Sequence, residues 1–123
     1  MAIGDARIVS FVGVSDLDAA ELFYGGVLGL SLRDARPFAL VADIGATQLR
    51  TTAVDDMRAA PYTVLGWQLD DIESTVDELV AKGVRFHRYD GMDQDDRGIW
   101  TAPSGAWIAW FHDHDFNTLS LQA

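Results

Sequence analysis

The sequence predicts an α+β fold of two βαβββ modules whose curled mixed sheets enclose a concave cleft. Two observations carry this prediction. A strand-like segment followed by a capped helix occurs twice, and the second copy repeats the first at a nearly constant offset. Residues 14–17 correspond to 69–72 at a shift of 55, and residues 29–32 correspond to 83–86 at a shift of 54. A period of about half the chain indicates an internal duplication within one domain, 1–123.

Module one is expected over residues 6–54. Residues 7–14 are rich in β-branched side chains and are followed by Ser15 and Asp16, which are good helix N-caps. Apolar residues then recur at helical spacing until Gly29, which can adopt the positive φ that ends a helix. Further strands are expected at 30–33, 38–43 and 47–54.

Module two is expected over residues 62–121, after a polar linker at 55–61. Asp71 caps a second helix whose apolar residues share one face, and Gly83 ends it. The Pro-Ser-Gly segment at 103–105 predicts a hairpin turn. Strands are expected at 62–69, 84–89, 98–101, 106–111 and 118–121.

The composition excludes several classes of function. Nineteen Asp and Glu residues against nine Lys and Arg give a formal net charge of −10, which would repel nucleic acid. This acidic surface either serves solubility or attracts a cationic ligand. The chain has no cysteine, which excludes disulfides, thiolate metal sites and cysteine nucleophiles. We find no signal peptide and no apolar run of the ~20 residues that span a bilayer, so we expect a cytoplasmic protein without a membrane partner.

Three segments resemble motifs of the vicinal oxygen chelate superfamily, which contains glyoxalase I, extradiol dioxygenases, fosfomycin-resistance transferases and bleomycin-resistance binding proteins. Residues 14–30 resemble the signature of the first module, 69–72 its counterpart in the second, and 111–121 the final turn and strand. In that turn His114 and Phe116 replace the usual proline and glycine. The resemblance covers nearly the whole chain and implies paired βαβββ modules and a homodimer. It does not by itself give the function, because the fold carries lyases, dioxygenases, transferases and binders.

The resemblance also implies a divalent metal site, and this chain lacks its ligands. In the family, His, Glu or Gln residues on the first and last strands of the modules hold the metal; the corresponding residues here are Val9, Arg50, Val64 and Ser120. Valine has no donor atom, a serine hydroxyl is a weak ligand, and an arginine repels a cation. We therefore predict no metal, no other cofactor and no catalytic residues of the glyoxalase I type.

A relocated metal site is the alternative. His87, or the pair His112 and His114, carries imidazoles that are able to bind a metal ion. The segment 112–115 is expected to be a turn, however, and histidines there are also common as surface residues. A single histidine such as His87 is also common as a packed or surface residue. The residues leave both interpretations open.

Without a metal, the informative side chains are those that strand alternation directs into the cleft. Arg50 stands out, because a guanidinium in a concavity requires a carboxylate, a phosphate or an aromatic face, or else a salt bridge to an acidic neighbour. Trp100 and Trp110 offer rings on which a planar ligand or a cation can stack, although core or dimer packing also explains them. The predicted ligand-binding residues are Phe11, Gln48, Arg50, Gln68, His87, Trp100, Trp110 and Ser120.

These observations support three hypotheses. The first is a metal-independent binding protein of the glyoxalase/bleomycin-resistance type that sequesters a cationic or aromatic small molecule. The second is an enzyme of the same superfamily, a lyase, dioxygenase or transferase, that acts without a metal or with a relocated one. The third is a structural or partner-binding role with an empty cleft. The first is the hypothesis that we carry forward, with a homodimer as the expected assembly.

Overall fold

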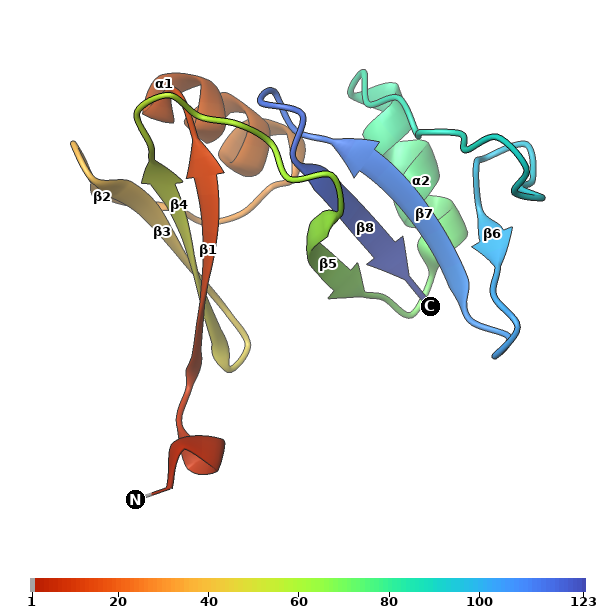
Figure 1. Ribbon diagram of the computed structural model, residues 1–123, viewed down its shortest axis with the longest axis horizontal. Coiled ribbons are helices and arrows are strands. Elements are labelled where there is room, and N and C mark those ends of the chain that lie inside the picture. The colour runs from red at the N-terminus through yellow and green to blue at the C-terminus, as the bar shows by residue number, and fades with distance from the viewer. Residues whose placement is uncertain (1) are drawn as a thin grey trace. The chain divides into compact units, whose positions relative to one another are not determined.

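The computed structural model describes residues 2–123 and contains two compact units, which we call module one and module two. Module one ends at Arg58, and module two runs from Ala59 to Ala123. Each module consists of a four-stranded mixed sheet with one helical segment (Figure 1). The α+β fold class and the duplicated βαβββ plan are therefore confirmed.

In module one the sheet has the strand order β1-β4-β3-β2. β1 and β4 run parallel, whereas β4, β3 and β2 are antiparallel neighbours. A short 3-10 turn, η1 (Ile3–Asp5), precedes the sheet. The strands are β1 (Ile8–Val14), β2 (Arg33–Ala35), β3 (Ala39–Ile44) and β4 (Thr47–Ala53). The expected strand at 30–33 is wrong in position, because β2 begins only at Arg33.

The helix of module one begins where the sequence predicts and then changes its hydrogen-bonding pattern. Asp16 caps α1 (Leu17–Ala20) by accepting a hydrogen bond from the backbone N–H of Asp18 at 2.8 Å. The next seven residues form a π-helical segment, η2 (Glu21–Val27), which contains two consecutive glycines. Glycine has low helix propensity, and this is the part of the helix that departs from α geometry. Gly29 has a φ of +75° and follows the helix.

Module two has the order β5-β8-β7-β6, which repeats the topology of module one strand for strand. Its strands are β5 (Thr63–Gln68), β6 (Trp100–Thr101), β7 (Trp107–His112) and β8 (Thr118–Gln122). The helix α2 (Ile72–Ala81) is capped by Asp71, whose side chain accepts a hydrogen bond from the Ser74 N–H at 3.1 Å. The hairpin between β6 and β7 turns at Gly105, which has a φ of +91°.

The strand expected at 84–89 does not form. The backbone N–H of His87 donates to the carbonyl oxygen of Trp110 at 2.7 Å, but the neighbouring groups bond to a side chain instead of a strand. Gln94 accepts a hydrogen bond from the Tyr89 N–H at 2.8 Å and donates one to the His87 carbonyl at 3.0 Å. Because this amide takes the backbone groups that a strand would use, the segment stays irregular.

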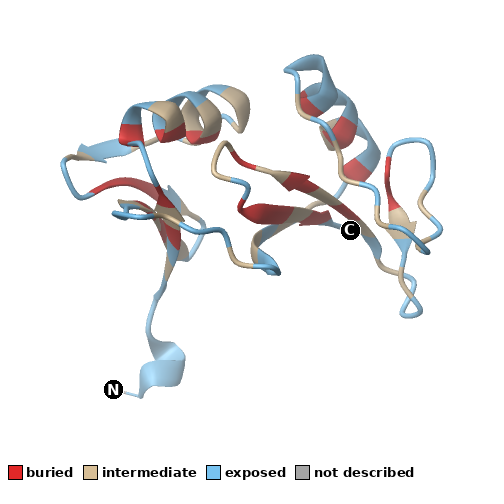
Figure 2. Cartoon of the chain, turned by 45° about the horizontal axis from the view of Figure 1, so that its top comes forward, coloured by how far each residue is buried: buried red, intermediate tan, exposed pale blue. Residues whose placement is uncertain are grey.

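Each sheet packs one face against the helical segment of its own module, and no helix of that module covers the other face (Figure 2). We call the uncovered side the open face. Among the described residues, no helix is long and apolar enough to cross a membrane. The helix-facing core includes Val12, Val14, Tyr24, Leu40 and Leu49 in module one and Ile72, Val76, Ala109, Phe111, Leu119 and Leu121 in module two.

Candidate functional site

The open face of module two displays polar and aromatic side chains in register. Ser120 on β8 pairs with Gly66 on one side and with Trp110 of β7 on the other. Phe111 and Leu119, one residue away along each strand, are fully buried on the opposite face. This alternation is a direct consequence of strand geometry, in which successive side chains point to opposite sides of the sheet.

Aromatic rings form a continuous cluster on this part of module two. The ring centroids of Trp100 and Trp110 lie 6.0 Å apart, and Tyr89 meets Trp110 edge to face at 5.3 Å. His87 contacts Tyr89 at 4.4 Å and His112 at 5.1 Å. We call these five residues the aromatic cluster. Their separations fall in the range at which aromatic pairs attract one another, so the rings position one another.

The aromatic cluster is only partly exposed, and this shifts the pKa of two members. All five side chains have intermediate burial. Burial raises the pKa of Tyr89, which keeps the phenol protonated. Burial and then repulsion from His87 lower the pKa of His112 below 6.5, against the opposing attraction of Asp113. The lowered pKa favours a neutral imidazole for His112 near neutral pH.

An amide pair lies on the same open face. The side chain of Gln122 donates a hydrogen bond to the Gln68 carbonyl oxygen at 3.0 Å. A shallow hollow of about 260 Å³ is lined by both amides, Ser120, Gly66 and Trp67. A Cβ at position 66 would lie only 2.4 Å from the Ser120 Oγ, so residue 66 has to be glycine while Ser120 keeps this position.

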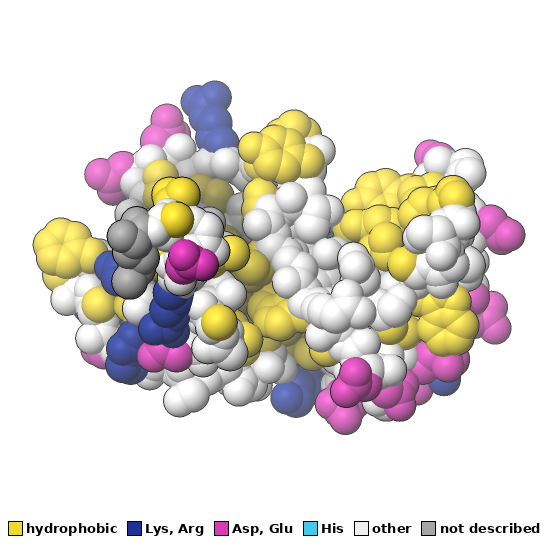
Figure 3. All heavy atoms as spheres, turned by 90° about the horizontal axis from the view of Figure 1, so that it is seen from below, with side chains coloured by type: hydrophobic (Ala, Val, Ile, Leu, Met, Phe, Trp, Pro, Cys, Tyr) yellow, Lys and Arg dark blue, Asp and Glu magenta, His cyan; other side chains and the backbone are white. Residues whose placement is uncertain are grey.

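The open face of module one differs in chemistry. Phe11 of β1 is 63% exposed and pairs in register with Arg50 of β4, while Val9 pairs with Gln48. Figure 3 shows that uncovered hydrophobic side chains and basic side chains both occur on the surface of the molecule. Module one thus brings three of the predicted ligand-binding residues, Phe11, Gln48 and Arg50, onto one face.

The salt bridge that would have explained Arg50 as a structural residue does not occur. Among residues 2–123, no carboxylate lies within 4 Å of its guanidinium. The acidic residue on the paired strand, Asp43, instead forms ion pairs with Arg7 and Arg33. These two arginines lower the pKa of the Asp43 carboxyl, Arg7 more strongly by its hydrogen bond.

The residues at the family's metal positions do not fit a metal ion. Val9 and Val64 have no donor atom, and Arg50 is a permanent cation. Within residues 2–123 no group of three or more His, Asp or Glu residues is gathered closely enough to hold an ion. His114, one of the alternative ligands, lies 2.9 Å from the carboxylate of Asp115, its chain neighbour.

The remaining predicted residues lie on module two. His87, Trp100 and Trp110 belong to the aromatic cluster, and Gln68 and Ser120 to the amide hollow beside it. Three further residues that were not among the predicted binding residues lie in the same cluster and hollow: Tyr89, His112 and Gln122. Strand alternation was the available signal, because each is two residues from a predicted one, but His112 was expected in a turn and is instead the last residue of β7.

Comparison with known proteins agrees with this architecture. The sequence model described as Glyoxalase/Bleomycin resistance protein/Dioxygenase superfamily matches residues 6–110. A solved glyoxalase/bleomycin resistance protein from Streptomyces sp. CB03234 is 25% identical, with a TM-score of 0.67 over 96% of this chain and 100% of that one. No curated protein matches the sequence significantly.

Two further solved structures share the fold at lower identity. A glyoxalase family protein from Enterococcus faecalis is 22% identical, with a TM-score of 0.72 and 100% of both chains covered. A lactoylglutathione lyase from Agrobacterium tumefaciens is 18% identical, with a TM-score of 0.75 over 98% of this chain and 95% of that one. At these identities the likeness is one of fold.

Proposed function

The chain belongs to the Glyoxalase/Bleomycin resistance protein/Dioxygenase superfamily, and on that premise we propose that it binds a planar aromatic cation on module two without using a metal. The observation that carries the proposal is the aromatic cluster on an open sheet face. Partly exposed rings at contact distance from one another offer both a stacking surface and a cation–π partner.

Charge supports a cationic ligand. The chain carries a formal net charge of −10, and its field attracts cations from solution. Near neutral pH the lowered pKa of His112 limits positive charge inside the aromatic cluster. A cation that stacks on Trp110 would therefore meet little opposing charge from that imidazole, and the neighbouring amides of Gln68 and Gln122 supply hydrogen-bonding groups.

The donor set supports metal independence. The family's ligand positions hold two valines, an arginine and a serine, none of which is a good ligand for Zn²⁺ or Mn²⁺. Elemental analysis of the purified protein tests this part. We expect substoichiometric metal, and one equivalent of a transition metal per chain would contradict it.

Calorimetric titration with matched small molecules tests the binding proposal. Proflavine serves as a planar cation, anthracene-2-carboxylate as a planar anion, and tetramethylammonium as a cation without a ring. We expect proflavine to bind most tightly, because it alone combines stacking with positive charge. Equal affinity for proflavine and the anthracene anion, or no heat of binding with either, would contradict the proposal.

An enzyme is the second candidate, favoured by the contact between His87 and His112. The lowered pKa leaves His112 able to accept a proton near neutral pH, as a general base must. Turnover of a bound compound that is lost in His112→Gln would support this candidate. Binding that continues without any chemical change would favour the binding protein.

We also propose that the protein is a cytoplasmic homodimer. Val9 and Phe11 share the open face of β1 and are 44% and 63% exposed, and such an apolar pair is typical of a surface that another protein surface covers. Light scattering tests the assembly. A mass of about 27 kDa is expected from two chains of 13.5 kDa each, and a monomer at micromolar concentration would contradict it.

A further inference from the structure

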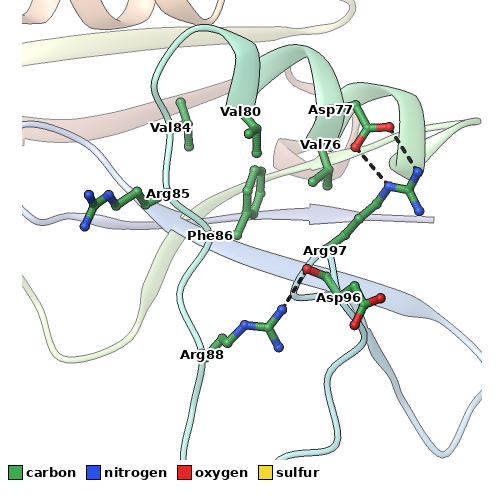
Figure 4. Close-up of a pocket in the computed structure, with 9 residues that line it drawn as sticks. All are labelled: Val76, Asp77, Val80, Val84, Arg85, Phe86, Arg88, Asp96 and Arg97. Atoms are coloured by element: carbon green, nitrogen blue, oxygen red, sulfur yellow. Dashed lines mark hydrogen bonds and ion pairs between the residues drawn. The ribbon is translucent and has the colours of Figure 1, made fainter.

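A groove in module two takes no part in the aromatic cluster. It runs between α2 and the irregular segment 84–88 and has a volume of about 440 Å³ (Figure 4). Its apolar floor contains Val80 and Phe86, and the Phe86 ring packs on the buried Phe111 at 5.4 Å. The groove therefore lies on the helix side of the sheet. Its volume is within the range of small-molecule sites, roughly 300–1,000 Å³.

Basic residues are concentrated at this groove. Three arginines and two aspartates line it, and the Glu73 carboxylate contacts one of the arginines, so basic and acidic charges are equal in number there, whereas the whole chain carries −10. A third of the nine basic residues of the chain are thus gathered at this one groove.

One of the three arginines is neutralised by its neighbours. Arg97 forms a two-pronged ion pair with Asp77, at 2.9 and 3.1 Å, and contacts Glu73 at 3.1 Å. The hydrogen bond from Arg97 lowers the pKa of the Asp77 carboxyl. This pair ties the 95–97 loop to α2 and accounts for Arg97 structurally.

The other two arginines keep their charge uncompensated. Arg88 donates to the backbone carbonyl oxygens of Asp95 and Asp96, at 2.7 and 2.8 Å, and these neutral groups fix its position without cancelling its charge. Arg85 makes no hydrogen bond or ion pair with any of residues 2–123. Figure 4 shows that the Arg88 side chain extends from the segment on the same side as Phe86, toward the groove, whereas the Arg85 side chain extends on the opposite side of the segment, away from the groove. The Asp96 side chain also lines the groove, but its carboxylate bonds to neither of these two arginines.

We propose that this groove binds an amphipathic carboxylate, with its apolar body on Phe86 and Val80 and its head group on Arg88. A guanidinium forms charge-assisted, geometrically specific hydrogen bonds with a carboxylate. Arg88 is already held by two carbonyls, so less conformational entropy is lost when the ligand binds. A single guanidinium without a carboxylate partner matches a monoanion better than a dianionic phosphate.

Calorimetric titration with octanoate tests the proposal, and octylammonium, octanol and octyl phosphate serve as chain-matched controls. We expect octanoate to bind more tightly than all three. Equal affinity for octanol or octylammonium would overturn the role of Arg88, and tighter binding of octyl phosphate would overturn the assignment to a carboxylate. Absence of octanoate binding would overturn the proposal as a whole.

Charge-removing variants locate the binding. Arg88→Gln should weaken octanoate binding about fivefold, as expected for a partly exposed charge pair. Arg58→Gln is the matched control, because Arg58 is 84% exposed and lies outside the groove. Equal effects of Arg88→Gln and Arg58→Gln would contradict the site. Trp110→Ala should leave octanoate binding intact, because Trp110 belongs to the proposed cation site and not to this groove. Loss of octanoate binding in Trp110→Ala would contradict the claim that the two sites are separate.

Discussion

The two modules share a topology but differ on their open faces. The helix-facing sides are alike, since both bury aliphatic and aromatic side chains such as Leu49 in module one and Leu119 in module two. On the open side, module one presents the exposed Val9 and Phe11 and the guanidinium of Arg50, which has no carboxylate partner among residues 2–123, whereas module two presents the aromatic cluster. The helix-facing side has to meet packing requirements that the open side does not. Differences that matter for binding are therefore concentrated on the open faces.

The corresponding hairpin turns differ in the same way. The turn between β3 and β4 contains Gly45, with a φ of +55°, and the equivalent turn between β7 and β8 contains Phe116, with a φ of +64°. In module two the buried Asp113 carboxylate accepts hydrogen bonds from the N–H groups of Asp115 and Asn117, both at 2.9 Å, and from the Asn117 amide at 2.8 Å. A glycine shapes one turn and a buried carboxylate the other.

Removal of that carboxylate should have the largest effect on stability. Asp113→Ala removes the carboxylate that accepts hydrogen bonds from two buried donors of Asn117, and we expect the free energy of unfolding of module two to fall by about 2–3 kcal/mol. All four tryptophans lie in module two, so tryptophan emission in a urea titration reports on this module.

Asp34→Ala in module one is the matched control. Asp34 also accepts a backbone hydrogen bond two residues along, from the Arg36 N–H at 2.9 Å, but it is exposed. We expect a clearly smaller loss, measured by far-ultraviolet circular dichroism. Equal losses in both variants would show that burial of Asp113 is not what distinguishes the two modules.

Exchange of the turn residues should have effects of about 1 kcal/mol and of opposite sign. A left-handed backbone costs a non-glycine residue about 1–2 kcal/mol, part of which glycine gives back as entropy in the unfolded chain. Phe116→Gly should therefore stabilise module two. Gly45→Ala should destabilise module one through its left-handed backbone alone, because a Cβ at position 45 would meet no other atom within 4 Å and so would cause no clash. Urea titrations of both variants measure this, and destabilisation by Phe116→Gly would contradict the strain.

A smaller effect should appear when pH is lowered. The pKa of His112 is lowered in the folded protein, so the folded state resists its protonation and module two loses stability as pH falls below 6.5. Protonation also adds positive charge beside His87 and Tyr89, partly offset by Asp113, and proflavine affinity should drop severalfold between about pH 7.5 and about pH 5.5. Calorimetry across this range measures it. His112→Gln should flatten the dependence, and an unchanged slope would assign the titration to another group.

Much of the fold could be predicted because alternation and capping are local signals. Asp16 and Asp71 cap helices as expected, and the offset of the repeat matches the equivalence of β1 and β5. The segment 84–89 has the composition of a strand, and its failure to pair depends on Gln94, whose amide takes its backbone groups. A contact of that kind is set by tertiary structure and leaves no pattern in the sequence.

The candidate site was predictable in part. Alternation placed Trp110 and Ser120 on one face, and the register of β7 and β8 pairs them. It was not predictable that Asp43 pairs with Arg7 and Arg33 and not with Arg50, because the sequence does not show which arginine lies closest to this carboxylate. The contact between His87 and His112 was also not predictable, because these residues lie on segments whose pairing the sequence does not specify.

The most direct test compares two tryptophans of the same strand that lie on opposite faces. Trp110 belongs to the aromatic cluster, whereas Trp107 is 43% exposed on the other side of β7. We expect Trp110→Ala to weaken proflavine binding about tenfold or more, because a stacking partner is lost, and Trp107→Ala to change it by less than about twofold. Circular dichroism confirms that both variants are folded. Equal affinities for the two variants, or a larger loss in Trp107→Ala, would contradict a ligand site on the open face of module two.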